Sequence, residues 1–357
     1  MRRLKWTFIF LVAASAALLV TLRAEVATWL MSRAVLDAMS TDVIGELPAG
    51  LHLAVCGAGS PLPAVDRSGP CLAVIAGERL FVVDAGTNGA RNLQRMGLPM
   101  GDIEGVFLTH FHSDHIDGLG ELAMLRWTTG SRSEPLPVHG PPGVADVVAG
   151  FNQAYAQDAG YRTAHHTAAV APPEGHGTAA QPFTMPEPGQ ETVILDASGL
   201  RISAFAVDHA PVAPAVGYRF DYAGRSLVIS GDTTPTDEVV RMADSVDLLA
   251  HEALAAELVG VLNRAANQTG RSNLARITHD ILDYHTTPAE AAGVASRAGA
   301  RHLLLYHIVP PLPIPGLESA FLEGVSEAYT GPVTLSRDGT FVSLPAESKE
   351  ILVSEQI

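Results

Sequence analysis

Seven consecutive residues, 109–115, combine three histidines with one aspartate in the order Thr-His-Phe-His-Ser-Asp-His. Imidazole nitrogens are good zinc ligands, and a carboxylate supplies the oxygen donor that a two-metal site also needs. The apolar residues 106–108 before this stretch predict a buried strand, and apolar residues at helical spacing after it predict a helix. The spacing therefore predicts a metal-binding loop between a strand and a helix. Its ligands would be His110, His112, Asp114 and His115.

Other candidate residues share one position, directly after a predicted strand. The whole set is Asp84, His110, His209, Asp232, His251 and His307. Side chains presented from strand ends converge at one edge of a sheet, where a rigid scaffold carries mobile loops. So many such residues at equivalent places indicate a metal centre rather than unrelated turn-forming residues.

The elements that would position these residues follow one another in two successive halves. Strands are predicted at residues 51–55, 71–76, 80–83, 106–108, 192–195, 201–207, 215–222, 226–230, 246–250 and 302–306. Helices are predicted at 144–157 and, opened by Thr287 and Pro288, through Arg297. The segment 161–190 is rich in Pro, Gly, Ala and Thr and is interpreted as a long loop or lid between the halves. Because strands lead and helices follow in both halves, the sequence predicts an α/β fold, a four-layer αββα sandwich.

Composition limits the classes of partner. The chain has 357 residues and a formal net charge of −15, with 23 basic against 38 acidic side chains, which is a poor global field for binding tRNA or DNA. Two cysteines cannot form a thiolate metal cluster, so any metal must be held by histidine and carboxylate. We expect Cys56 and Cys71 to be small buried residues near strand ends, although one disulfide is possible.

The N-terminus has the pattern of an exported protein. Arg2, Arg3 and Lys5 precede the uncharged apolar run 6–22, which predicts a signal peptide or membrane anchor over residues 1–24. No small-x-small cleavage site follows, which favours an uncleaved anchor over a cleaved signal; a buried helix is the remaining alternative. We expect a linker helix at 25–49, a hydrolase domain at 50–345 and a tail at 346–357. The predicted location is periplasmic or otherwise extracytoplasmic.

The motifs as a group resemble those of the metallo-β-lactamase-fold hydrolases, in the branch that contains ribonuclease Z and the zinc arylsulfatases and phosphodiesterases. The resemblance covers about residues 51–343 and rests on Asp84, Thr-His-Phe-His-Ser-Asp-His at 109–115, His209, Ser-Gly-Asp-Thr-Thr at 230–234, His-Glu-Ala at 251–253, His-Thr-Thr at 285–287 and His307. It implies that His110, His112 and His209 hold a first zinc ion. It implies that Asp114, His115 and His307 hold a second. Asp232 would bridge the two ions, and Asp84 would orient a ligand imidazole by hydrogen bonding.

The mechanism that this resemblance implies is metal-assisted hydrolysis by an activated water. Asp114 counts among the catalytic residues, as does His285, which would stabilise charge or protonate the leaving oxygen while Glu252 holds its ring. The alternative for His285 is a position beside a helix cap without chemistry. The cofactor is expected to be two Zn²⁺ ions, with Mn²⁺ or Fe²⁺ possible.

One part of the ribonuclease Z pattern is missing. In that enzyme a tRNA-binding arm lies between the third and fourth metal motifs, but here Asp232 follows His209 by only 23 positions. Because tRNA processing is cytosolic and needs basic contacts to phosphates, we expect instead a hydrolase of small anionic esters, aryl sulfates or phosphate diesters. The alternatives are a ribonuclease Z-type tRNA 3′-processing endonuclease and, outside the enzymes, a degenerate binding protein on the same fold. Nucleic acid is an unlikely partner in this interpretation, and a homodimer is possible.

Overall fold

The computed structural model describes residues 2–357, with side chains described for residue 6 and from residue 21 onward. The chain divides into two units, Met1–Val43 and Ile44–Ile357. The first contains one long helix, α1 (Arg2–Ser40). Within the described part of the chain, no helix combines the length and the apolar character needed to cross a membrane. Residues 7–20 of the expected anchor lie outside the side chains that are described.

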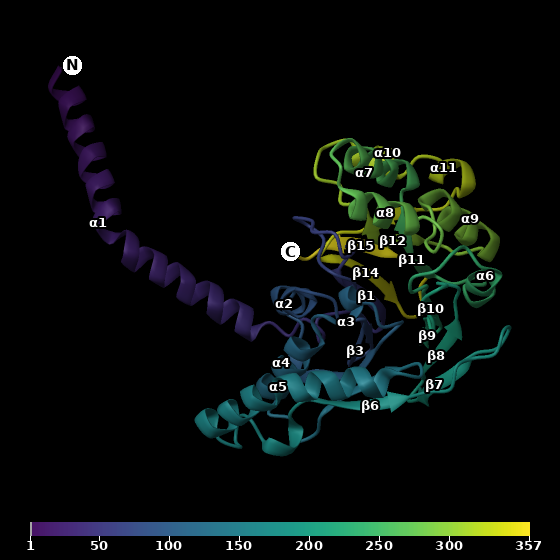
Figure 1. Cartoon of the computed structure of the whole chain (residues 1–357). Helices are drawn as coiled ribbons and strands as arrows, with labels where there is room; N and C mark the ends of the chain where they lie inside the picture. The colour runs from purple at the N-terminus through teal and green to yellow at the C-terminus, as the bar shows by residue number, and fades with distance from the viewer. Residues whose placement is uncertain (1) are drawn as a thin grey trace. The chain divides into compact units, whose positions relative to one another are not determined.

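Two sheets form the second unit (Figure 1). The first sheet contains, in spatial order, β15 (Leu352–Glu355), β14 (Thr340–Pro345), β1 (Gly50–Gly57), β2 (Cys71–Ala76), β3 (Arg79–Val83), β4 (Ile103–Phe107), β5 (Leu136–Gly140) and β6 (Thr178–Pro182). The second contains β13 (Val333–Leu335), β12 (Leu303–Val309), β11 (Leu248–Leu254), β10 (Arg225–Ile229), β9 (Val216–Tyr222), β8 (Leu200–Ala206) and β7 (Thr192–Ala197). The chain passes from one sheet to the other between β6 and β7, at the place where the boundary between halves was predicted.

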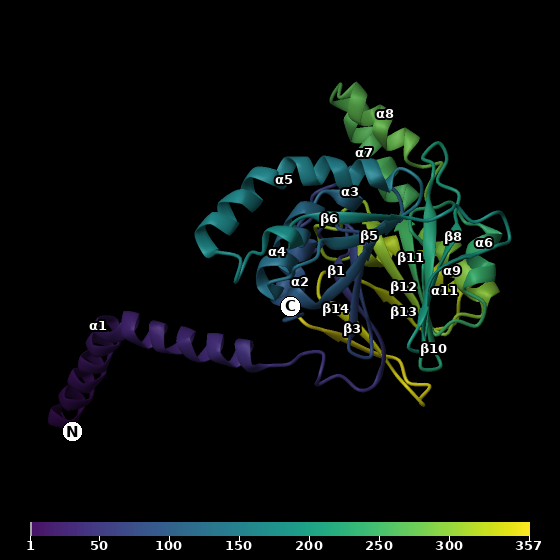
Figure 2. The same ribbon diagram turned by 90° about the horizontal axis from the view of Figure 1, so that it is seen from below.

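Helices cover the outer face of each sheet. On the first sheet they are α2 (Gly89–Arg95), α4 (Leu119–Gly130) and α5 (Val144–His166). On the second they are α6 (Asp237–Met242), α9 (Pro288–Ala298) and, beside α9, α11 (Val325–Ala328). The remaining helices are η1 (Met100–Asp102), α3 (Ser113–Ile116), η2 (Pro173–Gly175), α7 (Ala256–Gln268), α8 (Ser272–Asp280) and α10 (Leu317–Phe321). The predicted four-layer αββα arrangement is confirmed (Figure 2).

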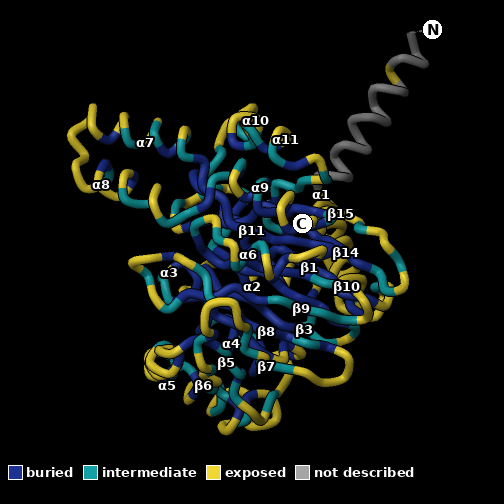
Figure 3. Tube along the Cα trace, turned by 90° about the vertical axis from the view of Figure 1, so that its right-hand side faces the viewer, coloured by how far each residue is buried: buried dark blue, intermediate teal, exposed yellow. Residues whose placement is uncertain are grey.

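The largest core lies between the two sheets, where the trace is almost uniformly buried (Figure 3). Phe107 of β4 meets Tyr218 of β9 edge-on, with ring centroids 5.5 Å apart, and Phe220 at 6.0 Å. Strands such as β1 are buried along their whole length because each is covered on both faces. Burial of this apolar surface is the main force that holds the sheets together and fixes their edges relative to each other.

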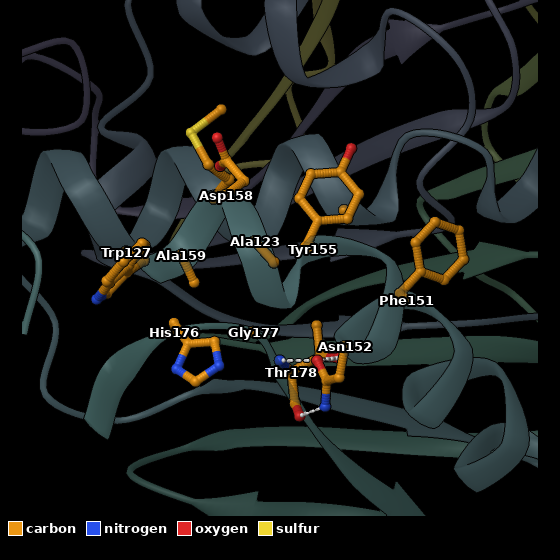
Figure 4. A pocket seen from close by; sticks show the side chains of 12 residues that line it. Ala123, Trp127, Phe151, Asn152, Tyr155, Asp158, Ala159, His176, Gly177 and Thr178 are labelled. Atoms are coloured by element: carbon orange, nitrogen blue, oxygen red, sulfur yellow. Dashed lines mark hydrogen bonds between the residues drawn. The ribbon is translucent and has the colours of Figure 1, made fainter. Parts of the chain in front are cut away.

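The segment after β5 differs from its prediction. Instead of a helix that ends near residue 157 and a long loop, α5 continues to His166, and residues 178–182 add the edge strand β6. Asn152 of α5 fastens the helix to this strand, because its amide accepts from the Thr178 backbone N–H at 2.9 Å and donates to the Thr178 carbonyl at 2.9 Å (Figure 4). The end of α5 was concealed because it contains glycine, threonine and histidine, which are weaker helix formers than alanine, and β6 was concealed because it depends on pairing with β5.

The ends of two central strands also differ from the prediction. β11 continues through His251 and Glu252 to Leu254, and β12 continues past His307 to Val309. The backbone of His307 has φ 49°, an unusual conformation for a residue other than glycine, and the pairing of the two strands shifts register beside it. These two histidines are therefore presented from within strands rather than after their ends.

Cys56 and Cys71 form a disulfide, with Cα atoms 5.0 Å apart. The expectation of two unpaired buried cysteines is wrong because β1 and β2 are adjacent antiparallel strands, whose pairing brings these two ends together. A sequence separation of 15 residues gave no direct sign of this contact.

Candidate metal centre

The loop between β4 and α3 carries the densest group of candidate ligands. The side chain of Asp84, which follows β3, fastens this loop: its carboxylate accepts from the backbone N–H and the hydroxyl of Thr109, both at 2.8 Å. Asp84 itself has a left-handed backbone, with φ 57°. The backbone at Gly86 lies so close to the metal loop that a Cβ on Gly86 would be 2.4 Å from the carbonyl oxygen of Asp114. The loop is therefore held by tight backbone contacts before any metal binds.

One group of side chains brings together the residues predicted to hold the first ion. One ligand atom from each of four residues lies close enough to the others to bind a single metal ion. The residues are His110, His112, His209 and Asp232. Nε2 of His110 lies 3.0 Å from Nδ1 of His112. The Nδ1 atom of His209 contacts the carbonyl oxygen of Tyr284 at 2.9 Å, so its Nε2 atom is free to face the centre. Hydrogen bonding of the outer ring nitrogen is the usual way in which a ligand histidine is oriented.

A second group contains the residues predicted to hold the other ion, Asp114, His115 and His307. The Nε2 atom of His307 lies 3.4 Å from Oδ2 of Asp114, and Nδ1 of His115 lies 2.8 Å from Asp84. Asp232 joins the two groups, because its Oδ2 atom lies 3.3 Å from Nε2 of both His115 and His307 and 3.9 Å from Nε2 of His110. This is the position that a bridging carboxylate requires.

Buried atoms without a hydrogen-bonding partner show that the centre suits metal ions. They include Nε2 of His115, Nε2 of His209 and Oδ1 of Asp232. Such atoms carry a large desolvation cost unless a ligand satisfies them. Nitrogen-rich donors with a shared carboxylate are typical of zinc, so the residues present fit two divalent ions.

Burial and neighbouring charges shift the pKa values of several candidate ligands. Burial lowers the pKa values of His110, His112 and His209 below the ordinary value, which favours the neutral, metal-binding form of these imidazoles. For Asp232, burial alone would raise the pKa, but His307 and His115 hold it well below its usual range. The Asp232 carboxylate between the two groups is therefore ionised, the form that a metal ligand requires.

His285 and Glu252 form a pair beside the second group. The Nδ1 atom of His285 lies 3.2 Å from Oε2 of Glu252, and the other carboxylate oxygen accepts from the Thr286 backbone N–H at 2.7 Å. Burial lowers the pKa of His285, but the charge and hydrogen bond of Glu252, together with the charge of Asp232, raise the pKa above its ordinary value. Thr287 caps α9 in a capping box with Glu290, so the helix cap does not use the imidazole. His251 is buried with Nδ1 on the Glu252 carbonyl and belongs to neither ligand group.

A cavity of about 260 Å³ opens over the centre. His112, Asp114, Asp232, His285 and His307 are part of its lining. Most of the remaining lining comes from residues that the sequence analysis did not identify as part of a site. They are Ser60, Pro61, Leu62, Leu274, Ile277, Thr278, Ile281 and Val309. The apolar residues 274, 277 and 281 recur at helical spacing, a signal that predicts one face of a helix but not what the face covers.

Comparison with known proteins supports what the geometry indicates. The model of the beta-lactamase superfamily domain matches residues 79–308. The chain is 34% identical over 292 residues to Ribonuclease Z of Mycobacterium bovis, covering 81% of this chain and 96% of the relative. It is 35% identical over 289 residues to Ribonuclease Z of Mycobacterium sp. strain KMS, covering 81% and 94%. This chain belongs to the beta-lactamase superfamily, among the proteins related to ribonuclease Z.

Solved structures share the fold. A metallo-beta-lactamase fold protein from Bacillus subtilis superposes with a TM-score of 0.58 at 21% identity, covering 82% of this chain and 98% of that one. The short form of human tRNase Z superposes with a TM-score of 0.57 at 20% identity, covering 82% and 99%. The protein is thus a metal-dependent hydrolase of this fold, with a candidate histidine and aspartate site for divalent metal ions.

Two earlier expectations change with these relatives. The expected extracytoplasmic location is wrong. The chain matches proteins named Ribonuclease Z over nearly their whole length, and tRNA processing by that type of enzyme is cytosolic. The relatives also favour the ribonuclease Z alternative over small anionic esters, and they give aryl sulfates no support.

Proposed function

We propose that this protein is a zinc-dependent phosphodiesterase of the ribonuclease Z type that cleaves RNA at the 3′ side of tRNA precursors. The observation that carries the proposal is the position of Asp232 between two complete ligand groups, with the His285–Glu252 pair beside them. The two Ribonuclease Z relatives are aligned over 96% and 94% of their length, so the match is not confined to the metal-binding motifs.

His110, His112 and His209 would hold one zinc ion, Asp114, His115 and His307 the other, and Asp232 would bridge them. Two ions bound there supply a nucleophilic water at neutral pH and neutralise the oxygens of the phosphate. Asp84 keeps the ring of His115 in one orientation through the 2.8 Å contact to Nδ1. Burial alone would raise the pKa of Asp114, but hydrogen bonding to His307 and the charges of His115 and His307 together lower it. Asp114 therefore stays ionised and would accept a hydrogen bond from the attacking water.

His285 is the proposed proton donor to the leaving oxygen. Its Nδ1 atom faces Glu252, whose carboxylate is completely buried and holds the ring at 3.2 Å. His285 also lines the cavity, so it lies where a bound substrate would reach it. A positioned acid of this kind contributes typically about 10²- to 10⁴-fold to the rate.

A second candidate is the hydrolysis of small anionic esters, aryl phosphate diesters or aryl sulfates. The observation that favours it is the lining of the cavity, in which none of the described residues is lysine or arginine. The interval between His209 and Asp232 is filled by β9, β10 and their connections, which leaves no arm there to bind tRNA. Recognition of a nucleic acid normally depends on cationic contacts to its phosphates.

The test is hydrolysis by the purified full-length protein, loaded with zinc, of a 3′-extended tRNA, bis-p-nitrophenyl phosphate and p-nitrophenyl sulfate, each with and without a chelator. Chelator-sensitive cleavage at the tRNA 3′ end is the expected result. Turnover of the small esters without tRNA cleavage would replace the proposal by the second candidate. If none of the three substrates is cleaved with Zn²⁺, Mn²⁺ or Fe²⁺, both candidates are wrong.

A further inference from the structure

The cavity over the metal centre has two chemically different sides. Part of its lining is the ligand side chains, and another part, the α8 wall, is mainly apolar, formed by Leu62 after β1, three residues of the α8 region and Val309 at the end of β12. The three are Leu274, Ile277 and Ile281. Ser60, Thr278 and Tyr284 add polar atoms to the lining. Apolar side chains beside a few charged groups are the usual lining of a pocket for an organic ligand, whereas an anion without an apolar part gains nothing from them.

Helices α7 and α8 stand out from the body of the molecule as a pair (Figure 3). Residues of α8 line the cavity. The pair is fixed at its base by a small apolar cluster of Leu254, Val259 and Val309, against which Leu62 and Ile281 pack. The amide of Asn263 on α7 donates to the carbonyl of Ala275 and to the hydroxyl of Thr278 on α8 at 2.6 and 2.9 Å. The orientation of α8 is therefore determined, and its apolar face is held toward the metal centre.

The exposed part of this wall has no partner within the described structure. Ile277 is 56% exposed although it lines the cavity, and no cluster of buried apolar residues includes it. The nearest cation on α8, Arg276, is paired with Asp280 at 2.8 Å and does not line the cavity. Ser60 adds one polar atom, since its hydroxyl is buried, lacks a hydrogen-bonding partner and belongs to the cavity lining.

We infer that the α8 wall is a subsite for an uncharged aromatic group attached to the scissile phosphate, with Ile277 as its main specificity-determining residue. The inference rests on the proposed phosphodiesterase function. Negative charge of the substrate is neutralised at the ligand side of the cavity, and the flat group beside it lies on Leu274, Ile277 and Ile281. A volume of about 260 Å³ suits one ring rather than several nucleotides.

The test compares two ligands that carry the same charged group. Isothermal titration of the zinc-loaded full-length protein with phenylphosphonate and methylphosphonate isolates the contribution of the ring. Ile277→Ser removes the apolar contact without adding charge. Val261→Ser is the matched control, because Val261 is 51% exposed on α7 of the same helical pair and does not line the cavity.

The expected result is that phenylphosphonate binds about tenfold more tightly than methylphosphonate to the wild type and to Val261→Ser, and that Ile277→Ser loses this preference. Equal affinities in the wild type, binding of neither phosphonate, or a full preference in Ile277→Ser would overturn the inference. The wild type could prefer phenylphosphonate and yet hydrolyse no phosphate diester. That outcome would support the aromatic subsite and refute the phosphodiesterase function.

The source of the aromatic group follows from the same variants. If KM rises in Ile277→Ser for bis-p-nitrophenyl phosphate alone, the subsite binds the aryl group of a small ester. A rise for the 3′-extended tRNA as well would identify a nucleobase. An unchanged KM for both substrates would contradict the assignment of Ile277.

Discussion

Asp84 offers the sharpest test of the metal centre, because it touches no metal and acts through His115. Its carboxylate makes three contacts of 2.8 Å, to the Thr109 backbone N–H, the Thr109 hydroxyl and Nδ1 of His115. In Asp84→Asn one oxygen still accepts from the backbone N–H, but an NH₂ group then faces His115. Asparagine also tolerates the left-handed backbone at this position, where φ is 57°, so the fold is not strained.

The consequence for His115 can be worked out from its ring atoms. Its Nδ1 atom must accept from the new NH₂ group, which moves the ring proton to Nε2, the atom that lies 3.3 Å from Asp232 and would bind the metal. Loss of such an orienting partner typically costs about 10- to 100-fold in metal affinity, or about 1.4 to 2.8 kcal/mol. Only the ion held by Asp114, His115 and His307 should be weakened, so one of two zinc equivalents is affected.

The assay is a zinc titration in competition with a chromophoric chelator, accompanied by thermal unfolding followed by circular dichroism. Asp102→Asn is the control, since Asp102 is an exposed aspartate paired with Arg132 at 2.7 Å, away from the centre. We expect one zinc equivalent to bind more weakly in Asp84→Asn and two equivalents of wild-type affinity in Asp102→Asn. Two equivalents of wild-type affinity in Asp84→Asn would refute the role of Asp84.

Three further predictions follow. Glu252→Gln should lower kcat for bis-p-nitrophenyl phosphate by about 10²-fold or more without loss of zinc, because His285 loses the charge that holds it; wild-type kcat would exclude the pair from catalysis. Burial alone would raise the pKa of Asp247, but the contacts with Arg225, the Ser226 backbone and Arg301 together keep it below its ordinary value. The stabilising effect of Asp247 is therefore present above the unfolded-state pKa of about 3.9 and is lost as the pH falls through the lower folded-state value. The gap in Tm between wild type and Asp247→Asn should therefore be largest near neutral pH and close in acid, and a gap that widened in acid would contradict this sign. Chelation should abolish hydrolysis and lower Tm, with both restored by zinc, because metal binding stabilises the native state alone; a Tm indifferent to the chelator would count against a metal in this centre.

Much of the candidate site could be predicted because its signals are local. The stretch 109–115 places four ligands within seven residues, and Asp84 and Asp232 follow short apolar runs whose β character is clear. Thr287 and Pro288 begin α9 as predicted, since a capping residue and a proline at the first position act through neighbouring backbone groups.

Other features could not be predicted because they depend on what packs against the segment. Residues 178–182 became an edge strand through pairing with β5, although their composition suggested a loop. Cys56 and Cys71 became bonded because β1 and β2 are paired. The sequence shows the apolar face of α8 only as a helical pattern. Ile277 belongs to a cavity only because the fold places α8 near the ligands.

The sequence by itself determined which residues are candidate metal ligands, their origin near strand ends and the fold that presents them, because each of these follows from neighbouring residues and their periodicity. Only the tertiary structure decided that Oδ2 of Asp232 lies between His115 and His307, and that Asp114 meets His307 across 193 residues of chain. The physical reason is that distances across the centre are set by the packing of the two sheets through their shared core. The sequence specifies which residues can be ligands. The distance between two ligands far apart in the sequence depends on the packing of the side chains buried between the sheets.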